Sequence, residues 1–385
     1  MSEAQSWRLL AGSLGAGATM PVGPGRWHVL FGGRNRPLLV PAGPLPTQRR
    51  CLRHFVGKPL QRRAAEMLLW LNARSPRAVL PELRCEPARD GAPSLLQAAS
   101  AAIQIGTPGP YQKASALLLN DPGRPFALAK IAMGRCADGA VRTEAEWLRT
   151  VAQVPEVDGL VPRLLDEGIT EGGRSYLVTS VAPSTATTDE FTPAHARFLQ
   201  ALRHVRMRVA DFEQSGRAQE LQDGLRQLRP HIGRAALAKL QRALADCERP
   251  LLYWSGPYVA SQGDFAPWNI RTLDERVFVF DWESGCEGAS PLDDVLHFLL
   301  IDPAVHRRQL GPRQMAEAMT RARAFAAESY PQWDWSERVV SALSLAYLLG
   351  LILRYSVPDL RISYRHPVIS SYWKLIERRA EWMAS

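Results

Sequence analysis

Residues Ser261 to Glu283 carry the side chains with the clearest chemistry in this sequence. The apolar run Val277 to Phe280 is typical of a strand, and the polar residues before it predict a β-hairpin from Asn269 to Asp281. Because facing residues of an antiparallel pair keep a fixed register, a turn centred on Glu275 places Asn269 beside Asp281. An amide oxygen and a carboxylate together suit Mg²⁺, which takes few protein ligands and the rest from water and phosphate.

Asp264 lies just before this hairpin, on a loop that Gly263 makes tight and Pro267 keeps from becoming helix. Its carboxylate is therefore free to accept a proton from an attacking hydroxyl. Asp264 and Asn269 could instead be ordinary turn residues, and Asp281 an ordinary strand end. We favour the chemical interpretation, since the spacing Gly-Asp-x4-Asn, then a strand, then Asp is more specific than a lone glycine loop.

The segments Gln262 to Asn269 and Phe280 to Glu283 resemble the catalytic and metal-binding segments of the aminoglycoside phosphotransferase and choline kinase-like family, relatives of protein kinases. The resemblance implies that Asp264 is the catalytic base and that Asn269 and Asp281 hold Mg²⁺. A His usually opens the motif, and Gln262 stands there instead. That His is mainly a structural hydrogen-bonding residue, a role that Gln can take. Glu283 could assist a second metal ion, or it could be a surface residue.

Lys130 interrupts an apolar, strand-like run from Phe126 to Ala132. Taken alone, such a lysine would extend its ammonium to solvent. In kinase-like folds, however, the strand lysine bridges the α- and β-phosphates and is held by a glutamate on the next helix. The sequence predicts a helix that begins at Thr143, and the resemblance favours Glu144 as the partner, with Glu146 as the competitor.

Two further segments are candidates for contact with a nucleotide. Gly106 and Gly109 lie in an open loop between predicted strands at 101–105 and 115–119. Glycine lets a backbone approach phosphate oxygens, although a plain hairpin turn explains this loop about as well. The resemblance places the hinge that contacts adenine, by position only, at Thr179, Ser180, Val181 and Ala182.

The rest of the chain is predicted to be mainly helical. Thr192 and Pro193 have the types of an N-cap and first helical residue, and amphipathic patterns follow at 198–212 and 221–244. The apolar segment 339–353 is shorter than the ~20 residues of a transmembrane helix, so it predicts a buried core helix. A last helix is expected at 372–382. Asp294 matches an aspartate of the family, and a structural cap explains it equally. The histidines among these helices lack ligand spacing, which favours surface or capping roles: His195, His204 and His231.

These patterns predict an α+β, protein-kinase-like bilobal fold, with a small antiparallel β lobe carrying one helix and a mainly helical large lobe. We expect an N-terminal extension or small domain of unknown role at 1–98, a nucleotide-binding lobe at 99–182, and at 183–385 a helical lobe with the catalytic hairpin and the acceptor site.

The composition sets further bounds on function. The 385 residues have a formal net charge of +9, which favours anionic partners such as nucleotide phosphates. The basic residues are dispersed and do not alternate with aromatics, so we expect no nucleic-acid binding. The 5 cysteines are scattered without a C-x-x-C motif, which favours a reducing, cytoplasmic location. No signal for an oligomeric state is present.

The sequence therefore predicts a Mg²⁺-dependent enzyme that transfers the γ-phosphate of ATP or GTP to a hydroxyl of a small molecule. The excess of arginine leans toward an anionic or neutral acceptor, such as a sugar or a glycolipid intermediate. The main alternative is a nucleotide-binding pseudokinase or scaffold, which the unusual Gln262 and the sparse glycine loop suggest.

Overall fold

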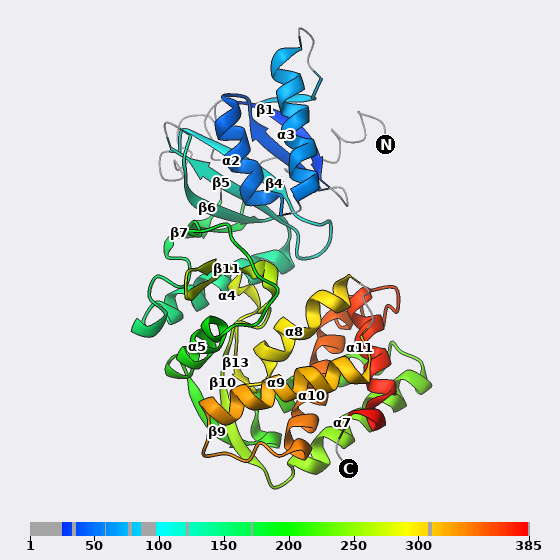
Figure 1. Ribbon diagram of the computed structural model, residues 1–385. Coiled ribbons are helices and arrows are strands. Elements are labelled where there is room, and N and C mark those ends of the chain that lie inside the picture. The colour runs from blue at the N-terminus through cyan, green and yellow to red at the C-terminus, as the bar shows by residue number, and fades with distance from the viewer. Residues whose placement is uncertain are drawn as a thin grey trace. The chain divides into compact units, whose positions relative to one another are not determined.

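The computed structural model describes residues 25–32, 36–57, 59–75, 79–85, 98–120, 123–170, 172–306 and 310–383. They form two compact units (Figure 1). The first comprises the residues up to Arg149 together with Pro162–Thr185, and the second comprises Thr150–Val161 and Ala186 onward.

An eight-stranded antiparallel sheet forms the first unit, in the order β3-β1-β2-β4-β5-β6-β8-β7. Its strands are β1 (Gly25–Gly32), β2 (Arg36–Pro41), β3 (Glu82–Cys85), β4 (Ser100–Ile105), β5 (Lys113–Leu119), β6 (Pro125–Ala132), β7 (Leu164–Ile169) and β8 (Ser175–Ser180). β2 pairs directly with β4, with Leu38 opposite Gln104. The strands before residue 98 are therefore part of the same sheet as the predicted nucleotide-binding lobe.

Helices α2 (Leu45–Phe55) and α3 (Pro59–Arg74) lie side by side against this sheet (Figure 1). They pack Cys51, Leu52 and Leu69 onto an apolar cluster of strand residues. Burial of these side chains stabilises the unit by roughly 1.5–3 kcal/mol for each large apolar residue. The amphipathic stripe of α2 fixes how this helix lies on the strands, whereas α3 buries Leu69 alone among its side chains.

Helix α4 (Arg135–Val151) begins eight residues earlier than the sequence predicted, so the expected start at Thr143 is wrong. Its first two turns are held by tertiary contacts, since Ala137 and Val141 pack with Leu177 of β8. Asp138 in the first turn accepts hydrogen bonds from Arg174 and from the backbone of Ser175. These contacts outweigh the helix-weakening effect of a glycine in the second turn.

The second unit is mainly helical, as predicted. Its helices are α5 (Pro193–Ala201), α6 (Gly216–Leu228), α7 (Arg234–Leu251), α8 (Asp293–Val305), α9 (Pro312–Ser329), α10 (Glu337–Ser356) and α11 (Pro367–Glu377). A three-stranded sheet has the order β13-β10-β9, and β11 pairs with β12 alone. These strands are β9 (Met207–Asp211), β10 (Ser255–Ser261), β11 (Ile270–Leu273), β12 (Arg276–Val279) and β13 (Cys286–Ala289).

The apolar helix α10 is the centre of this unit. By length and composition it could cross a membrane, but 89% of its most apolar window is buried inside the protein. It contacts α6, α7, α8, α9 and α11 (Figure 1). The prediction of a buried core helix at 339–353 is confirmed.

Three helical predictions need correction. The helix expected at 198–212 ends at Ala201, because Met207–Asp211 becomes an edge strand paired with β10. The pattern at 221–244 is divided between α6 and α7, with a break that includes Pro230, which cannot donate a helical hydrogen bond. The helix expected at 372–382 is α11, which begins at Pro367 and ends at Glu377.

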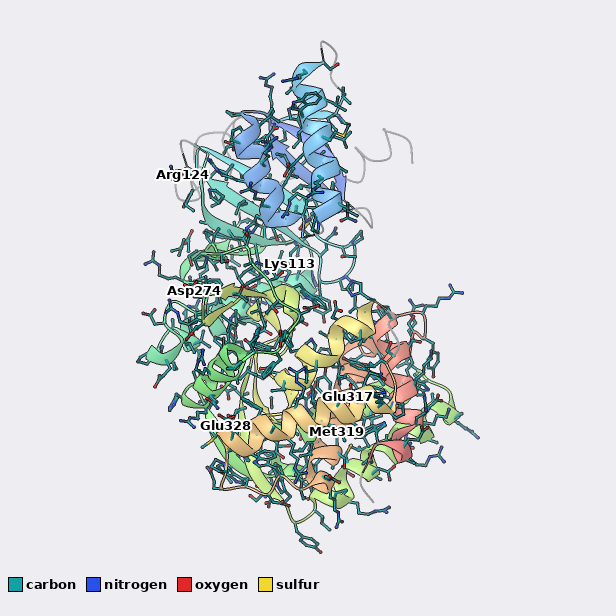
Figure 2. All side chains as sticks on the ribbon, in the orientation of Figure 1. Lys113, Arg124, Asp274, Glu317, Met319 and Glu328 are labelled. Atoms are coloured by element: carbon teal, nitrogen blue, oxygen red, sulfur yellow. The ribbon has the colours of Figure 1, made fainter. Side chains whose placement is uncertain are left out.

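The hairpin of β11 and β12 forms as predicted, but its register differs by one residue. Leu273 pairs with Arg276 across a two-residue turn, so Asn269 lies level with Phe280 and not with Asp281. The turn is tight because Asp274 adopts a left-handed backbone with a φ of 50°, which aspartate tolerates. The position of Asp274 on the ribbon is labelled in Figure 2. Asp281 consequently lies one residue beyond the level pair of Asn269 and Phe280.

Candidate active site

The first unit contains a buried ion pair between Lys130 and Glu144. The Lys130 Nζ lies 2.6 and 2.7 Å from the two carboxylate oxygens of Glu144. The Lys130 side chain is 10% exposed and that of Glu144 is 2% exposed. Glu146 is exposed, so the structure pairs the favoured glutamate and not its competitor.

The amphipathic stripe of α4 explains this pairing. Ala137, Val141, Ala145 and Leu148 are all buried at helical spacing, and Glu144 lies within the same stripe. Lys130 stands opposite Leu177 in the sheet, on the face that α4 covers. The glutamate is thus turned inward by the helix period, and its buried charge is matched by the lysine ammonium.

The two glycine-loop candidates are part of a hairpin between β4 and β5. The Gly106 N–H donates to the carbonyl of Lys113 at 2.8 Å, so this amide is already used within the protein. Gly109 has a φ of 157° and its carbonyl accepts from Gln112. The loop therefore matches the hairpin-turn alternative, and its phosphate-binding role stays a prediction.

The proposed hinge residues lie at the end of β8. Thr179 and Ser180 belong to the strand, and the Thr179 hydroxyl donates to the Leu128 carbonyl at 3.4 Å. Val181 and Ala182 follow the strand, and within the described residues their backbones make no hydrogen bond. Backbone groups of this kind are what a nucleotide base would need.

In the second unit, β10 ends at Ser261 and leads directly into the loop that carries Asp264. Gly263 in this loop has a φ of 78°, and a Cβ there would lie 2.0 Å from the backbone oxygen of Ser284. Only glycine permits both the left-handed backbone and this close approach. The loop and the turn after β12 are thereby held against each other.

Gln262 connects the same two segments through its side-chain amide. Its Nε2 donates to the carbonyls of Phe280 and Asp281 at 3.1 and 2.6 Å, while its Oε1 accepts from the Asp264 N–H at 2.9 Å. The side chain is fully buried. An amide supplies donor and acceptor at once, which explains how Gln can stand where the family usually has His.

Each oxygen of the Asp264 carboxylate contacts a side chain. The Asn269 Nδ2 donates to Oδ2 at 2.8 Å, and the His297 Nε2 lies 2.9 Å from Oδ1. The carboxylate remains 29% exposed, so it can meet a substrate. Within the described residues, no lysine or arginine forms an ion pair with it. This arrangement is suited to a proton acceptor.

Asn269 and Asp281 are the candidate ligands for Mg²⁺. Asn269 is 4% exposed and uses its Nδ2 to hold Asp264, which leaves its Oδ1 as an available oxygen ligand. Asp281 has a left-handed backbone with φ 65° and ψ 59°, an uncommon conformation that tends to occur at functional sites. An amide oxygen and a carboxylate form a hard-oxygen donor set, so these residues fit Mg²⁺.

Asp294 supports the loop and does not cap its own helix. Its carboxylate accepts from the Ser261 hydroxyl at 2.8 Å and from the backbone N–H groups of Gln262 and Gly263 at 2.9 and 3.1 Å. Burial raises the pKa of Asp294, and these hydrogen bonds oppose that shift. Arg354 of α10 donates to the Gly263 carbonyl at 2.7 Å.

Sequence reasoning missed His297, Arg354 and Tyr347, and no local pattern pointed to them. His297 follows Asp294 by three residues on α8, so the two share a helix face. That spacing indicates a shared role only when the structure shows that Asp264 lies beside α8. Of the histidines that were noted, His195 is a buried cap, since its Nδ1 accepts from the Thr192 N–H at 3.1 Å, whereas His204 and His231 are exposed.

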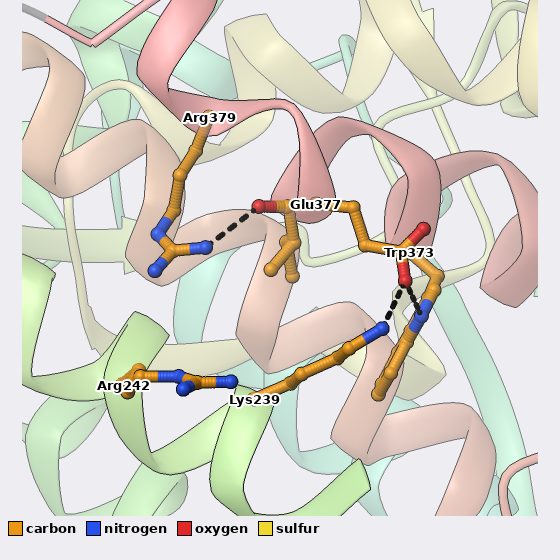
Figure 3. A pocket seen from close by; sticks show the side chains of 6 residues that line it. Lys239, Arg242, Trp373, Glu377 and Arg379 are labelled. Atoms are coloured by element: carbon orange, nitrogen blue, oxygen red, sulfur yellow. Dashed lines mark hydrogen bonds and ion pairs between the residues drawn. The ribbon is translucent and has the colours of Figure 1, made fainter. Parts of the chain in front are cut away.

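A cavity of about 290 Å³ lies elsewhere in this unit, between α7 and α11 (Figure 3). Three of the charged residues that line it, Lys239, Glu377 and Arg379, are paired within the protein. Lys239 and the Trp373 indole contact Glu377, and Arg379 pairs with Asp246. Glu377 is held well ionised by Lys239, which lowers its pKa. Because none of its lining residues belongs to the Asp264 loop or the hairpin after it, we place the candidate chemistry at Asp264 and not in this cavity.

Solved structures of known proteins are similar to this one in fold. No family model matches this chain, and no curated protein matches its sequence. A thermostable aminoglycoside phosphotransferase APH(4)-Ia in complex with ADP and hygromycin B has a similar structure, with a TM-score of 0.51 and 14% identity over 76% of this chain and 98% of that one. The structure of APH(4)-Ia itself gives a TM-score of 0.50 at 14% identity, over 74% and 94% of the two chains.

This chain has the aminoglycoside phosphotransferase fold. The predicted fold class is therefore confirmed. A microcompartment-associated aminopropanol kinase is also found, at a TM-score of 0.45 and 15% identity over 72% of this chain and 93% of that one. In this chain, β6 and α4 of the first unit carry Lys130 and Glu144, and the second, mainly helical unit carries the Asp264 loop.

Proposed function

We propose that this protein is a small-molecule kinase that transfers the γ-phosphate of ATP or GTP to a hydroxyl group. The observation that carries the proposal is the state of Asp264: a partly exposed carboxylate, fixed by Asn269 and His297 and not neutralised by a cation. The fold of nucleotide-dependent phosphotransferases supports it.

Asp264 accepts the proton of the acceptor hydroxyl as its oxygen bonds to the γ-phosphorus and the bond to the leaving diphosphate breaks. Lys130 holds the nucleotide phosphates, and Glu144 orients Lys130. Val181 and Ala182 offer backbone N–H and C=O groups to the purine ring of the nucleotide. Most of the rate enhancement then comes from positioning and electrostatics, because the transition state spreads its charge over several oxygens.

Asn269 and Asp281 would hold Mg²⁺ next to this loop. When it is bound, the ion would neutralise negative charge on the phosphates. Gln262 keeps the two ligand segments together, since it bonds to the Asp264 backbone and to the Asp281 carbonyl at once. We regard Gln262 as a working substitute for His, which weakens the pseudokinase alternative.

The net charge of +9 favours an acceptor without positive charge, so we expect sugars to be better acceptors than aminoglycosides. The test is a phosphate-transfer screen with labelled ATP and GTP against sugars, amino alcohols and aminoglycosides, with and without Mg²⁺. Transfer that depends on Mg²⁺ and is absent in Asp264→Ala supports the proposal. Nucleotide binding without transfer to any acceptor would favour the pseudokinase.

A further inference from the structure

His297 is the one histidine among the described residues that contacts Asp264. It projects from α8 and is 2% exposed, and its Nε2 lies 2.9 Å from Asp264 Oδ1. A carboxylate oxygen only accepts hydrogen bonds, so the proton of this contact is on the His297 Nε2. The other oxygen of Asp264 accepts from Asn269. Two donors from different elements therefore fix the plane of the carboxylate.

The second ring nitrogen of His297 meets a chain of tyrosines. The Tyr347 hydroxyl of α10 lies 3.2 Å from His297 Nδ1, and the Tyr372 hydroxyl of α11 lies 3.2 Å from that of Tyr347. Both tyrosines are buried, and burial raises the pKa of each phenol far above its ordinary value, so both keep their protons. One consistent direction of donation runs from Tyr372 to Tyr347, to His297 and on to Asp264.

The acidic neighbours of His297 on its own helix are engaged elsewhere. Asp293 forms an ion pair with Arg217, and Asp294 binds the backbone of the loop before Asp264. Asp264 is therefore the carboxylate left for His297. Arg354 donates to a backbone carbonyl of the loop, that of Gly263.

We propose that His297 is a positioning residue for Asp264, and this proposal rests on the function proposed above. In its neutral form, with the proton on Nε2, His297 holds Oδ1 of Asp264 without cancelling the charge of the carboxylate. Tyr347 fixes that tautomer by donating to Nδ1, and Tyr372 donates to Tyr347. His297 exchanges no proton in the reaction, since the hydroxyl proton passes to Asp264.

The kinetic test uses the full chain with an acceptor found in the screen. His297→Leu is expected to lower kcat by about 10²-fold, the cost of a small misplacement of a catalytic group, with the KM for nucleotide nearly unchanged. His297→Gln, which restores an N–H donor, should recover much of the loss. Tyr347→Phe should lower kcat by a smaller factor. The exposed His231→Leu serves as the matched control. Wild-type kcat in a folded His297→Leu protein would overturn the proposal.

A second measurement does not depend on turnover. Nitrogen NMR of protein labelled at histidine should show a His297 ring with a protonated Nε2 and a bare Nδ1 near neutral pH, assigned by its loss in His297→Gln. Asp264→Asn and Tyr347→Phe should each shift that signal, whereas His231→Leu should not. A doubly protonated ring, or a signal indifferent to Asp264→Asn, would refute the proposed positioning role. If no acceptor is phosphorylated by the wild type, this measurement alone decides whether His297 holds Asp264.

Discussion

The two units hold their key carboxylates in opposite ways. Glu144 in the first unit is almost fully buried and is paired with the ammonium of Lys130. Asp264 in the second unit is partly exposed and is held by the amide of Asn269 and the imidazole of His297. One carboxylate has its charge matched by a cation, and the other is only hydrogen-bonded.

In the function proposed above, this difference separates a supporting residue, Glu144, from a reacting one, Asp264. A carboxylate paired with a cation is stabilised in its charged form and accepts a proton poorly. A carboxylate held by neutral donors keeps its orientation, and its charge remains available to a substrate proton. We therefore expect loss of the charge at Asp264 to lower turnover, and loss of a charge in the Lys130–Glu144 pair to lower stability and nucleotide binding.

The largest effect is expected for Asp264→Asn. The substitution keeps the shape of the side chain and removes the proton acceptor, so turnover should fall by about 10²–10⁴-fold while nucleotide affinity is retained. Steady-state kinetics and nucleotide titration of the same preparation measure both quantities. Asp274→Asn, at the hairpin turn where Asn also tolerates the left-handed backbone, is the control. Undiminished turnover would show that Asp264 is not the proton acceptor.

Lys130→Met should act on stability as well as on nucleotide binding. It leaves the Glu144 carboxylate buried without its cation, which costs about 3–5 kcal/mol of unfolding free energy. The double variant Lys130→Met/Glu144→Leu should regain much of that stability but not the nucleotide affinity. Denaturant unfolding and nucleotide titration separate the two losses. Wild-type stability of Lys130→Met would show that the ion pair is unimportant to the fold, and equal loss in the single and double variants would show that the unpaired Glu144 charge is not its cause.

Gln262→Leu tests how the loop of Asp264 is held. The variant leaves the Asp264 N–H and the carbonyls at Phe280 and Asp281 without their partner, and each unsatisfied buried group costs about 1–3 kcal/mol. We expect lower stability and lower turnover together. Gln262→His, the residue usual in the family, should retain most of both. If Gln262→His raises turnover far above the wild type, the natural glutamine limits activity.

The smallest effect concerns the buried, uncharged His195. Burial lowers its pKa to about 4, from an ordinary value of 6.5. The unfolded chain therefore binds the proton first, and stability should fall as the pH drops below about 6.5, by about 2 kcal/mol at pH 5. Urea unfolding at pH 7.5 and pH 5 measures this loss. In His195→Gln, which can keep the capping bond to Thr192, the loss should shrink. An unchanged pH dependence would mean that folding does not lower the pKa of His195.

The sequence alone determined the features that depend on local pattern. The apolar run around Lys130 and the segment at 339–353 were recognised as a strand and a core helix, since their periods and lengths are set by neighbours in the chain. The Gly-Asp-x4-Asn spacing identified the loop of Asp264 before its contacts were known. The hairpin was recognised too, although its register was wrong by one residue because the left-handed backbone at Asp274 permits a shorter turn.

Only the tertiary structure decided which distant residues meet. The edge strand at Met207–Asp211 forms because β10 offers it a partner, against a helical pattern in the sequence. His297, Tyr347 and Tyr372 come from three helices, and nothing in the local sequence of any of them points to Asp264. Local propensity fixes elements over a few residues, whereas the surroundings of a carboxylate depend on packing between segments far apart in the chain.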